Sequence, residues 1–403
     1  MTQTGKIRTS DEYVPGIAWA AHRGASPDTA ARAEDLMNSL LSPGAFRMTD
    51  IQPDIILFMS GGSERRALEL ADTSRPVLLL SIRGNNAYAA ATEVMAWMVN
   101  NGRRAVLSDA ADAFESGLLI NWTRVAGAMH SLVGTRAGLL GSVSEWLVAS
   151  DVSAVTLRDR FGIELTGIPW SGMPDYRSES PDQALMSRFA GQRPEGLEDA
   201  ARVLSLLRRA MAGNRLRAIA VECFSLVQQR KVTACLALAQ LNTEGVVAAC
   251  EGDTASMAGM TVGLALTGSV PWMANTTRLS DESLILSHCT APFDFVGNIE
   301  LPAHYETGYS LAVDGEVNMT DVTVYRFSEQ LDRAFIAEGR VTGRPRLAEA
   351  CRTQVEISLP REALRQLREI PLGNHLLVSA GRHADLIRLA CRYKGIAISE
   401  EIV

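Results

Sequence analysis

The sequence has no dense run of Lys or Arg, and its 403 residues carry a formal net charge of −7. Proteins that bind nucleic acid need a concentrated basic surface to meet the phosphate backbone. The composition therefore argues against a nucleic-acid partner. The six cysteines also lack the CxxC spacing of structural metal sites and redox motifs. We expect reduced thiols packed among apolar neighbours, as in a cytosolic protein.

The first residues contain no apolar stretch after their basic positions, so no secretory signal is recognised there. We therefore expect a cytoplasmic protein. One uncharged segment, residues 254–277, has the length of a membrane span. It contains glycines, a proline and several hydroxyl side chains, which favour a buried helix running into a buried strand. We expect no membrane partner.

The chain is longer than a single hydrophobic core usually organises, so two or three domains are expected. Its 47% hydrophobic and 21% charged residues are typical of globular proteins. Apolar runs at residues 54–60 and 75–81 each lead into a turn of small residues and then a helical pattern. Short strands that alternate with helices indicate parallel βαβ units. We predict a first α/β domain over residues 1–134.

The same alternation restarts at residues 136–141, a strand pattern with a glycine at its carboxyl end. Residues 155–169 read as a further strand. Two later apolar runs end in acidic residues, which is typical of strands that deliver side chains to the edge of a sheet. We predict a second α/β domain over residues 135–295.

From about residue 300 the texture changes to polar and apolar residues in alternation, with a hairpin-like turn at Asp314-Gly315. That period of two predicts half-buried antiparallel strands. A helical pattern at residues 383–395 closes the chain. We predict a β-rich C-terminal domain over residues 296–403.

Acidic residues follow two of the buried strands in the second predicted domain. In open parallel sheets, ligands lie beyond the carboxyl ends of the strands. We interpret Glu251 as functional, with Gly252 allowing the backbone to approach a ligand and Asp253 capping the next helix. Glu222 ends the neighbouring strand and fits either a substrate contact or a hydrogen-bonded structural acid.

Two histidines complete the candidate set. His288 follows an apolar run and is either a ligand or a buried core residue, whereas His375 opens an apolar run after a Gly-Asn turn. Carboxylates and imidazoles form an oxygen and nitrogen ligand set that suits Mn²⁺ or Mg²⁺ better than a thiolate-rich zinc site does. We predict that Glu251 and His375 meet in a common pocket.

The segments CEGD, PWMAN, SHCTAP and GNHLLVSAGRHADL resemble, in order and approximate spacing, motifs of the L-fucose isomerase and L-arabinose isomerase superfamily. The resemblance covers most of the chain, and the turns SGGSE and RGNNAYAA are similar to that family's substrate-facing turns. It implies two Rossmann-like parallel-sheet domains followed by a β-rich, barrel-like C-terminal domain. It also implies a homo-oligomer, an active site completed by a neighbouring subunit, bound Mn²⁺ (or Mg²⁺), and interconversion of aldose and ketose sugars through an enediol.

The resemblance implies a role for each matching residue. Glu251 would be a metal ligand and proton-transfer group, and His375 a second ligand. The family's second acid falls on Asn275, 24 residues after Glu251. An amide can coordinate a cation through its oxygen but cannot exchange protons as a carboxylate does. Asn275 is therefore predicted to be a neutral metal ligand or a substrate contact. The predicted substrate-binding residues are Glu222, Arg83, Asn85, Asn86 and His288.

Three functions stay open on this evidence. The first is an isomerase-like enzyme that acts on a small sugar or sugar derivative. The second is a sugar or sugar-acid enzyme of a different reaction type on the same scaffold, which the replacement at Asn275 motivates. The third is a non-catalytic sugar-binding protein, against which the C-terminal His375 motif counts.

Overall fold

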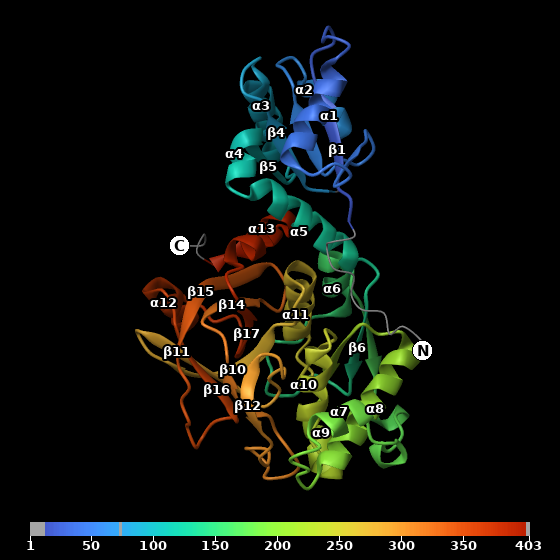
Figure 1. Cartoon of the computed structure of the whole chain (residues 1–403), viewed down its shortest axis with the longest axis vertical. Helices are drawn as coiled ribbons and strands as arrows, with labels where there is room; N and C mark the ends of the chain where they lie inside the picture. The colour runs from blue at the N-terminus through green and yellow to red at the C-terminus, as the bar shows by residue number, and fades with distance from the viewer. Residues whose placement is uncertain (1–12, 72–74, 400–403) are drawn as a thin grey trace. The chain divides into compact units, whose positions relative to one another are not determined.

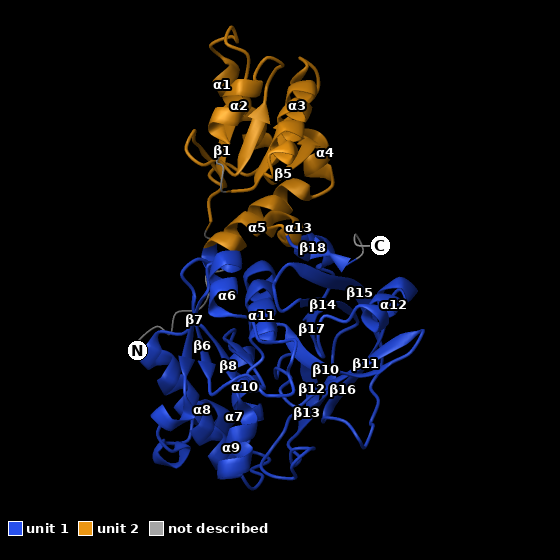
Figure 2. Cartoon of the chain, turned by 180° about the vertical axis from the view of Figure 1, so that it is seen from behind, with its two compact units in different colours: residues 1–7, 131–388, 396–403 blue, residues 8–130, 389–395 orange. Residues whose placement is uncertain are grey.

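The computed structural model describes residues 13–71 and 75–399. The chain is mixed α/β, with two parallel sheets and a closed six-stranded antiparallel barrel (Figure 1). It divides into two compact units (Figure 2). Unit 2 contains the described residues up to His130 together with 389–395, and unit 1 contains 131–388 and 396–399. Unit 1 thus holds both the second predicted α/β domain and most of the predicted C-terminal domain.

Unit 2 is built on a five-stranded parallel sheet in the order β2-β1-β3-β4-β5. Its strands are β1 (Gly16–Ala20), β2 (Arg47–Met48), β3 (Ile55–Phe58), β4 (Val77–Ser81) and β5 (Ala105–Asp109). Its helices are α1 (Thr29–Leu40), α2 (Glu64–Leu70), α3 (Ala87–Asn100), α4 (Ala110–Glu115) and α5 (Leu118–Leu132), the last of which ends just past the division. β3 and β4, the two predicted apolar runs, are buried along their whole length, as central parallel strands require.

Unit 1 contains the second parallel sheet, in the order β7-β6-β8-β9. Its strands are β6 (Arg136–Leu140), β7 (Glu164–Ile168), β8 (Ala218–Val221) and β9 (Val247–Ala249). The helices of this part are α6 (Ala154–Phe161), α7 (Gln183–Arg188), α8 (Leu197–Asn214), α9 (Cys223–Arg230), α10 (Cys235–Thr243) and α11 (Thr254–Thr267). α11 leads into strand β10 (Trp272–Leu279), which confirms the interpretation of residues 254–277. Within the described part of the chain, no helix combines the length and apolarity needed to cross a bilayer.

The prediction of a strand over residues 155–169 is wrong in its first half, which forms α6. Ser153 caps this helix by accepting a hydrogen bond of 3.0 Å from the Thr156 N–H. Gly162 ends it in the left-handed conformation, with φ at 75°. A capping serine and a terminating glycine outweigh the strand preference of the Val and Thr residues at its start.

The antiparallel barrel runs β14-β17-β10-β11-β16-β15 and closes through pairing of β14 with β15, while β18 adds to β15 in parallel. Besides β10, its strands are β11 (Ser283–His288), β14 (Asp321–Phe327), β15 (Arg333–Gly343), β16 (Thr353–Ser358) and β17 (His375–Ala380). The added strand β18 is Ala397–Ile398. β10 and β11 precede residue 296, where the β-rich domain was predicted to begin. Because β10 pairs with β17 and β11 with β16, the barrel needs strands from both sides of that predicted boundary.

The predicted hairpin turn at Asp314-Gly315 is wrong, because both residues lie within strand β13 (Asp314–Val317). β13 pairs with β12 (Val296–Glu300), whereas the following strand, β14, pairs inside the barrel. An Asp-Gly pair marks a hairpin only where its two flanking strands pair with each other. The helices of this part are α12 (Arg361–Glu369) and α13 (Ala384–Lys394), and α13 confirms the predicted closing helix.

Candidate metal centre

Glu251 follows strand β9 in a tight turn that holds its side chain in a fixed place. Glu251 and Gly252 both have left-handed backbones, with φ of 57° and 68°. A Cβ atom on Gly252 would lie 2.2 Å from the Ser142 carbonyl oxygen, so only glycine fits. The Glu251 carbonyl accepts from the Ser144 N–H at 3.1 Å, and Trp146 Nε1 donates to Glu251 Oε2 at 2.7 Å. The carboxylate is therefore anchored from both ends.

Two barrel strands bring histidines to this carboxylate. His288 is the last residue of β11, and His375 is the first residue of β17. Their Nε2 atoms lie 3.6 Å and 3.5 Å, respectively, from Glu251 Oε1. The ligand atoms of the three residues all lie within 4.8 Å of one another. We call Glu251, His288 and His375 the Glu251 centre. The structure thus brings the predicted Glu251 and His375 together. His288, which was predicted as a ligand or core residue and as a substrate contact, lies beside them.

The donor atoms of the Glu251 centre fit a divalent cation. His288 Nε2 and His375 Nε2 are buried and have no hydrogen-bond partner among the described residues. Leaving such an atom unpaired costs about 1–3 kcal/mol. His288 Nδ1 shares a hydrogen bond of 2.9 Å with Thr290 Oγ1, which leaves Nε2 to face the carboxylate. Two imidazole nitrogens and a carboxylate oxygen around one point are a donor set that first-row divalent ions prefer.

Asp253 connects the Glu251 centre to helix α11. Its Oδ1 accepts from the Ser256 N–H at 2.6 Å, which confirms the predicted helix cap. Its Oδ2 lies 2.8 Å from His375 Nδ1. A carboxylate on the second nitrogen fixes the orientation and tautomer of a ligating imidazole. The sequence pattern identified the capping role of Asp253 but not this contact with His375.

Arg326 of strand β14 is a site residue that the sequence analysis missed. Its side chain is 2% exposed, and its guanidinium lies 3.3 Å from Asp253 Oδ2. Its other acceptors are Ser256 Oγ, Ser150 Oγ and the carbonyl oxygens of Ala149, Leu372 and His375. The available signal was a charged residue inside the otherwise apolar run VTVYRF, because buried charges require partners.

The charges of the site strongly shift its pKa values. Burial raises the pKa of the Glu251 carboxyl, but His288 and His375 outweigh burial and hold that pKa well below its usual value. Burial acts in the same direction on Asp253, whose pKa is also held well below its usual value by Arg326 and His375. For His375, burial lowers the pKa, but Asp253 and Glu251 raise it to about 9. A cation must therefore displace a proton from His375 at neutral pH.

Asn275 and Glu222 also lie in unit 1, but their side-chain oxygens form hydrogen bonds with residues outside the Glu251 centre. Asn275 in β10 pairs with His375 across the ladder, and its Oδ1 accepts from Asn374 Nδ2 at 2.7 Å. The oxygen that was predicted to coordinate metal is thus engaged by a neighbouring amide. Glu222 Oε2 accepts from the Ser142 N–H at 3.1 Å, and its Oε1 accepts from the Ser225 hydroxyl. These contacts match the alternative interpretation of Glu222 as a hydrogen-bonded acid.

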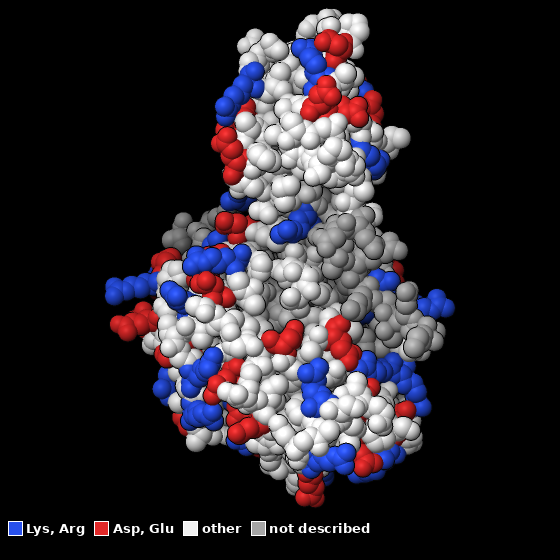
Figure 3. Space-filling model, in the orientation of Figure 1, with Lys and Arg blue, Asp and Glu red and all other residues white. Residues whose placement is uncertain are grey.

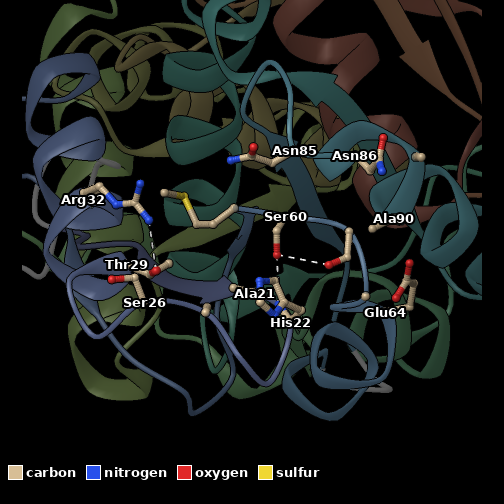
Figure 4. A pocket seen from close by; sticks show the side chains of 15 residues that line it. Ala21, His22, Ser26, Thr29, Arg32, Ser60, Glu64, Asn85, Asn86 and Ala90 are labelled. Carbon is tan, nitrogen blue, oxygen red and sulfur yellow. Dashed lines mark hydrogen bonds between the residues drawn. The ribbon is translucent and has the colours of Figure 1, made fainter.

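The remaining predicted residues lie in unit 2, on the turn between β4 and α3. Arg83 pairs with Asp112 at 2.7 Å and with Asp109 at 3.4 Å. Asn85 and Asn86 line a cavity of about 610 Å³ at the carboxyl end of the unit 2 sheet (Figure 4). We call it the unit 2 cavity, and its wall comes mainly from the turns that follow β1, β3 and β4.

The sequence matches no protein-family model and no curated protein in these comparisons. The relation to the sugar isomerase superfamily therefore stays a hypothesis that rests on the motifs quoted above.

Proposed function

We propose that this chain is a divalent-metal-dependent enzyme that interconverts the aldose and ketose forms of a small sugar or sugar derivative through an enediol. The observation that carries the proposal is the Glu251 centre. There, two buried imidazole nitrogens face one carboxylate oxygen and have no hydrogen-bond partner within the described part of the chain. The two parallel sheets support the Rossmann-like part of the resemblance, because each has its first long strand flanked on both sides by later strands. A homo-oligomer with an active site completed by a second subunit belongs to the same proposal.

Isomerisation removes a proton beside a carbonyl group and returns it to the adjacent carbon, while negative charge develops on the substrate oxygens. When bound, Mn²⁺ or Mg²⁺ supplies electrostatic stabilisation of that charge. Glu251, His288 and His375 would hold the ion. Asp253 keeps the His375 ring in place through Nδ1, and Arg326 keeps Asp253 ionised in its buried position. The chain's own contribution is therefore a preorganised, charge-balanced binding site.

Two features of the site bear on proton transfer. The low pKa of the Glu251 carboxyl makes it a weak base at neutral pH, because its anion is already stabilised by two imidazoles. Asn275 has no exchangeable acid proton, and its oxygen is hydrogen-bonded to Asn374. These two observations favour, as a second candidate, a metal-dependent sugar or sugar-acid enzyme whose reaction does not need paired carboxylates.

The test is a screen of aldoses in deuterated water with protein that was treated with chelator and then reloaded with Mn²⁺. We expect exchange of the C2 proton, followed by NMR, to depend on Mn²⁺ and to accompany ketose formation. Glu251→Gln and His288→Gln should abolish both exchange and Mn²⁺ binding. Glu282→Gln, at an exposed position of unit 1, is the matched control and should retain both.

Three results would redirect the proposal. Exchange that survives Glu251→Gln would remove that residue from the reaction. Mn²⁺-dependent consumption of a sugar or sugar acid without C2 exchange would favour the second candidate. Tight sugar binding without any turnover would favour a sugar-binding protein instead.

A further inference from the structure

Five of the six cysteines lie in unit 1, and two of them are in direct contact. Cys223 is the first residue of α9, and Cys250 directly precedes Glu251. Strands β8 and β9, which lead to these two cysteines, are parallel neighbours, so both residues lie at the same edge of the sheet. Cys223 Sγ and Cys250 Sγ are 3.2 Å apart. We call Cys223 and Cys250 the thiol pair.

The thiol pair is buried but lies close to the surface. Cys223 is 5% exposed and Cys250 is 3% exposed. Cys223 stands in the chain between Glu222 and Phe224, which are both partly exposed. The ring of Trp146 packs edge-on against Phe224 and is itself 47% exposed. An oxidant the size of water therefore reaches the Cys223 sulfur when these neighbouring side chains move.

The two thiols differ in their electrostatic surroundings. Cys223 begins α9, where the free backbone N–H groups of the helix stabilise negative charge. Cys250 is followed by the Glu251 carboxylate, which disfavours a second negative charge nearby. Cys223 is therefore the better nucleophile, and Cys250 is placed to react with its oxidised form. A reactive thiol with a second thiol beside it is the arrangement that peroxide-sensitive proteins use.

The geometry of the pair allows a disulfide. The two sulfurs of a disulfide lie about 2.05 Å apart, so the pair closes by an approach of roughly 1 Å. Cys223 and Cys250 stand at the ends of strand-to-helix connections and not within a strand ladder, where the backbone has room to adjust.

Closure of the pair would move the turn that carries Glu251. The Asp253 N–H donates to the Cys250 carbonyl at 3.0 Å, and Asp253 in turn orients His375. A disulfide draws the backbone of Cys250 toward Cys223 and displaces the Glu251 carboxylate and Asp253 together. Loss of such supporting contacts weakens metal binding by about 10- to 100-fold.

We propose that Cys223 and Cys250 form a reversible disulfide on exposure to hydrogen peroxide, and that this disulfide weakens cation binding at the Glu251 centre. The Cys223 thiolate attacks one peroxide oxygen, the O–O bond breaks, and the released hydroxide takes up the thiol proton and leaves as water. The Cys250 sulfur then attacks the sulfenic acid on Cys223. The S–O bond breaks, and the hydroxide leaves with the Cys250 proton as a second water. Two thiols thus lose two electrons, which reduce one peroxide to two water molecules.

The first test is a peptide map of the full chain after treatment with hydrogen peroxide in the absence of metal. The protein is then blocked with iodoacetamide under denaturing conditions and digested with trypsin and a glutamate-specific protease. This digestion places the five unit 1 cysteines on separate peptides, so the linked pair has a unique mass. We expect the Cys223–Cys250 link, and we expect dithiothreitol to release it. Cys391→Ala, at a buried cysteine of unit 2, is the matched control and should still form the link.

The second test is calorimetric titration of Mn²⁺ into reduced and oxidised protein, with circular dichroism to show that both are folded. The oxidised parent should bind about tenfold more weakly than the reduced parent. Cys250→Ala undergoes any other oxidation but cannot form the disulfide, so its two states should bind Mn²⁺ equally.

The proposal is overturned if the peptide map shows no Cys223–Cys250 link, or if the linked protein binds Mn²⁺ as tightly as the reduced protein. The disulfide itself stands apart from the proposed function, whereas its effect on the cation rests on that function. Reduced protein that binds no Mn²⁺ would contradict the proposed function and the effect on the cation, and the peptide map would still decide whether the disulfide forms.

Discussion

The Glu251 centre of unit 1 and the unit 2 cavity both lie where parallel strands end, but they are assembled in opposite ways. The Glu251 centre takes its side chains from residues 251, 288 and 375, and it places two buried imidazoles against a carboxylate. The unit 2 cavity takes most of its wall from three turns within residues 21–90, and most of its polar groups are uncharged amides and hydroxyls. On the face drawn in Figure 3, acidic and basic side chains are interspersed over the surface.

The groups of the Glu251 centre depend on one another more strongly than those of the unit 2 cavity. In the Glu251 centre, Arg326 balances Asp253, Asp253 holds His375, and His375 faces Glu251. Removing any one of them leaves a buried charge without its partner, which is expensive in a medium of low dielectric constant. In the unit 2 cavity the hydroxyls of Ser60 and Thr29 each bond a neighbour, but no buried charge among the described lining residues depends on them. Substitutions should therefore have large and coupled effects in the first site and small, additive effects in the second.

The largest effect is expected at Arg326. Arg326→Met should lower the free energy of unfolding by about 3–5 kcal/mol, because it leaves the buried Asp253 carboxylate without its cationic partner. Denaturant unfolding followed by circular dichroism measures this change. Arg365→Met, on the exposed face of α12, removes two surface ion pairs and should cost far less, because water and salt screen exposed charges. Equal costs for the two variants would show that the buried network is not coupled as described.

The stability of the chain should depend on pH through His375. His375 has a pKa of about 9 in the folded chain against 6.5 for the free side chain. The fold therefore binds the His375 proton more tightly than the unfolded chain does. This contribution is fully present below pH 6.5 and is lost as the pH rises through about 9. It amounts to about 3 kcal/mol for a fully buried group.

The measurement is the free energy of unfolding of chelator-treated protein between pH 6 and about 9.5, covering the range over which His375 titrates. His375→Gln should flatten the decline, and His383→Gln, elsewhere in unit 1, should preserve it. A decline that persists unchanged in His375→Gln would assign it to other groups. Added Mn²⁺ should stabilise the alkaline form most, because the cation binds the neutral imidazole.

Asp253→Asn should weaken divalent cation binding by about 10- to 100-fold, since the carboxylate that orients His375 is replaced by a neutral amide. Calorimetric titration of Mn²⁺ into chelator-treated protein measures the affinity, with circular dichroism to show that the variant is folded. Asp281→Asn, whose side chain is 83% exposed, is the matched control and should bind Mn²⁺ unchanged. If both variants bind equally, Asp253 serves only to cap α11.

Strands and site residues could be predicted from the sequence where a local pattern determines them. Strands β3 and β4 were predictable because each is a short apolar run before a turn of small residues. Glu251 and Asp253 were found in a similar way, because they directly follow the apolar strand β9. Predictions failed where distant pairing decides the structure. The strands β10 and β11 join the barrel by pairing with β17 and β16, which lie about 70–100 residues further along the chain. A local sequence pattern does not reveal such distant pairing.

The candidate site shows the same limit. A capping motif identified Asp253, because a cap depends on the next three residues only. Its contact with His375 and Arg326 depends on closure of the barrel, which places residues from β14 and β17 against the start of α11. Asn275 was selected by its distance along the chain from Glu251. The hydrogen bond from Asn374 that engages its oxygen arises only when β10 and β17 pair.

The smallest effect is expected in the unit 2 cavity, at the left-handed Asn85. Asn85→Ala should lower the free energy of unfolding by about 1 kcal/mol, because Asn and Gly adopt the left-handed backbone at a φ of 52° more readily than Ala does. Asn85→Gly should stay within a few tenths of a kcal/mol of the parent, since glycine adopts this backbone freely but gains entropy when unfolded. Denaturant unfolding of the two variants side by side measures the difference. If Asn85→Gly costs as much as the Arg326 substitution, the Asn85 amide takes part in a coupled network, and the two sites are alike in kind.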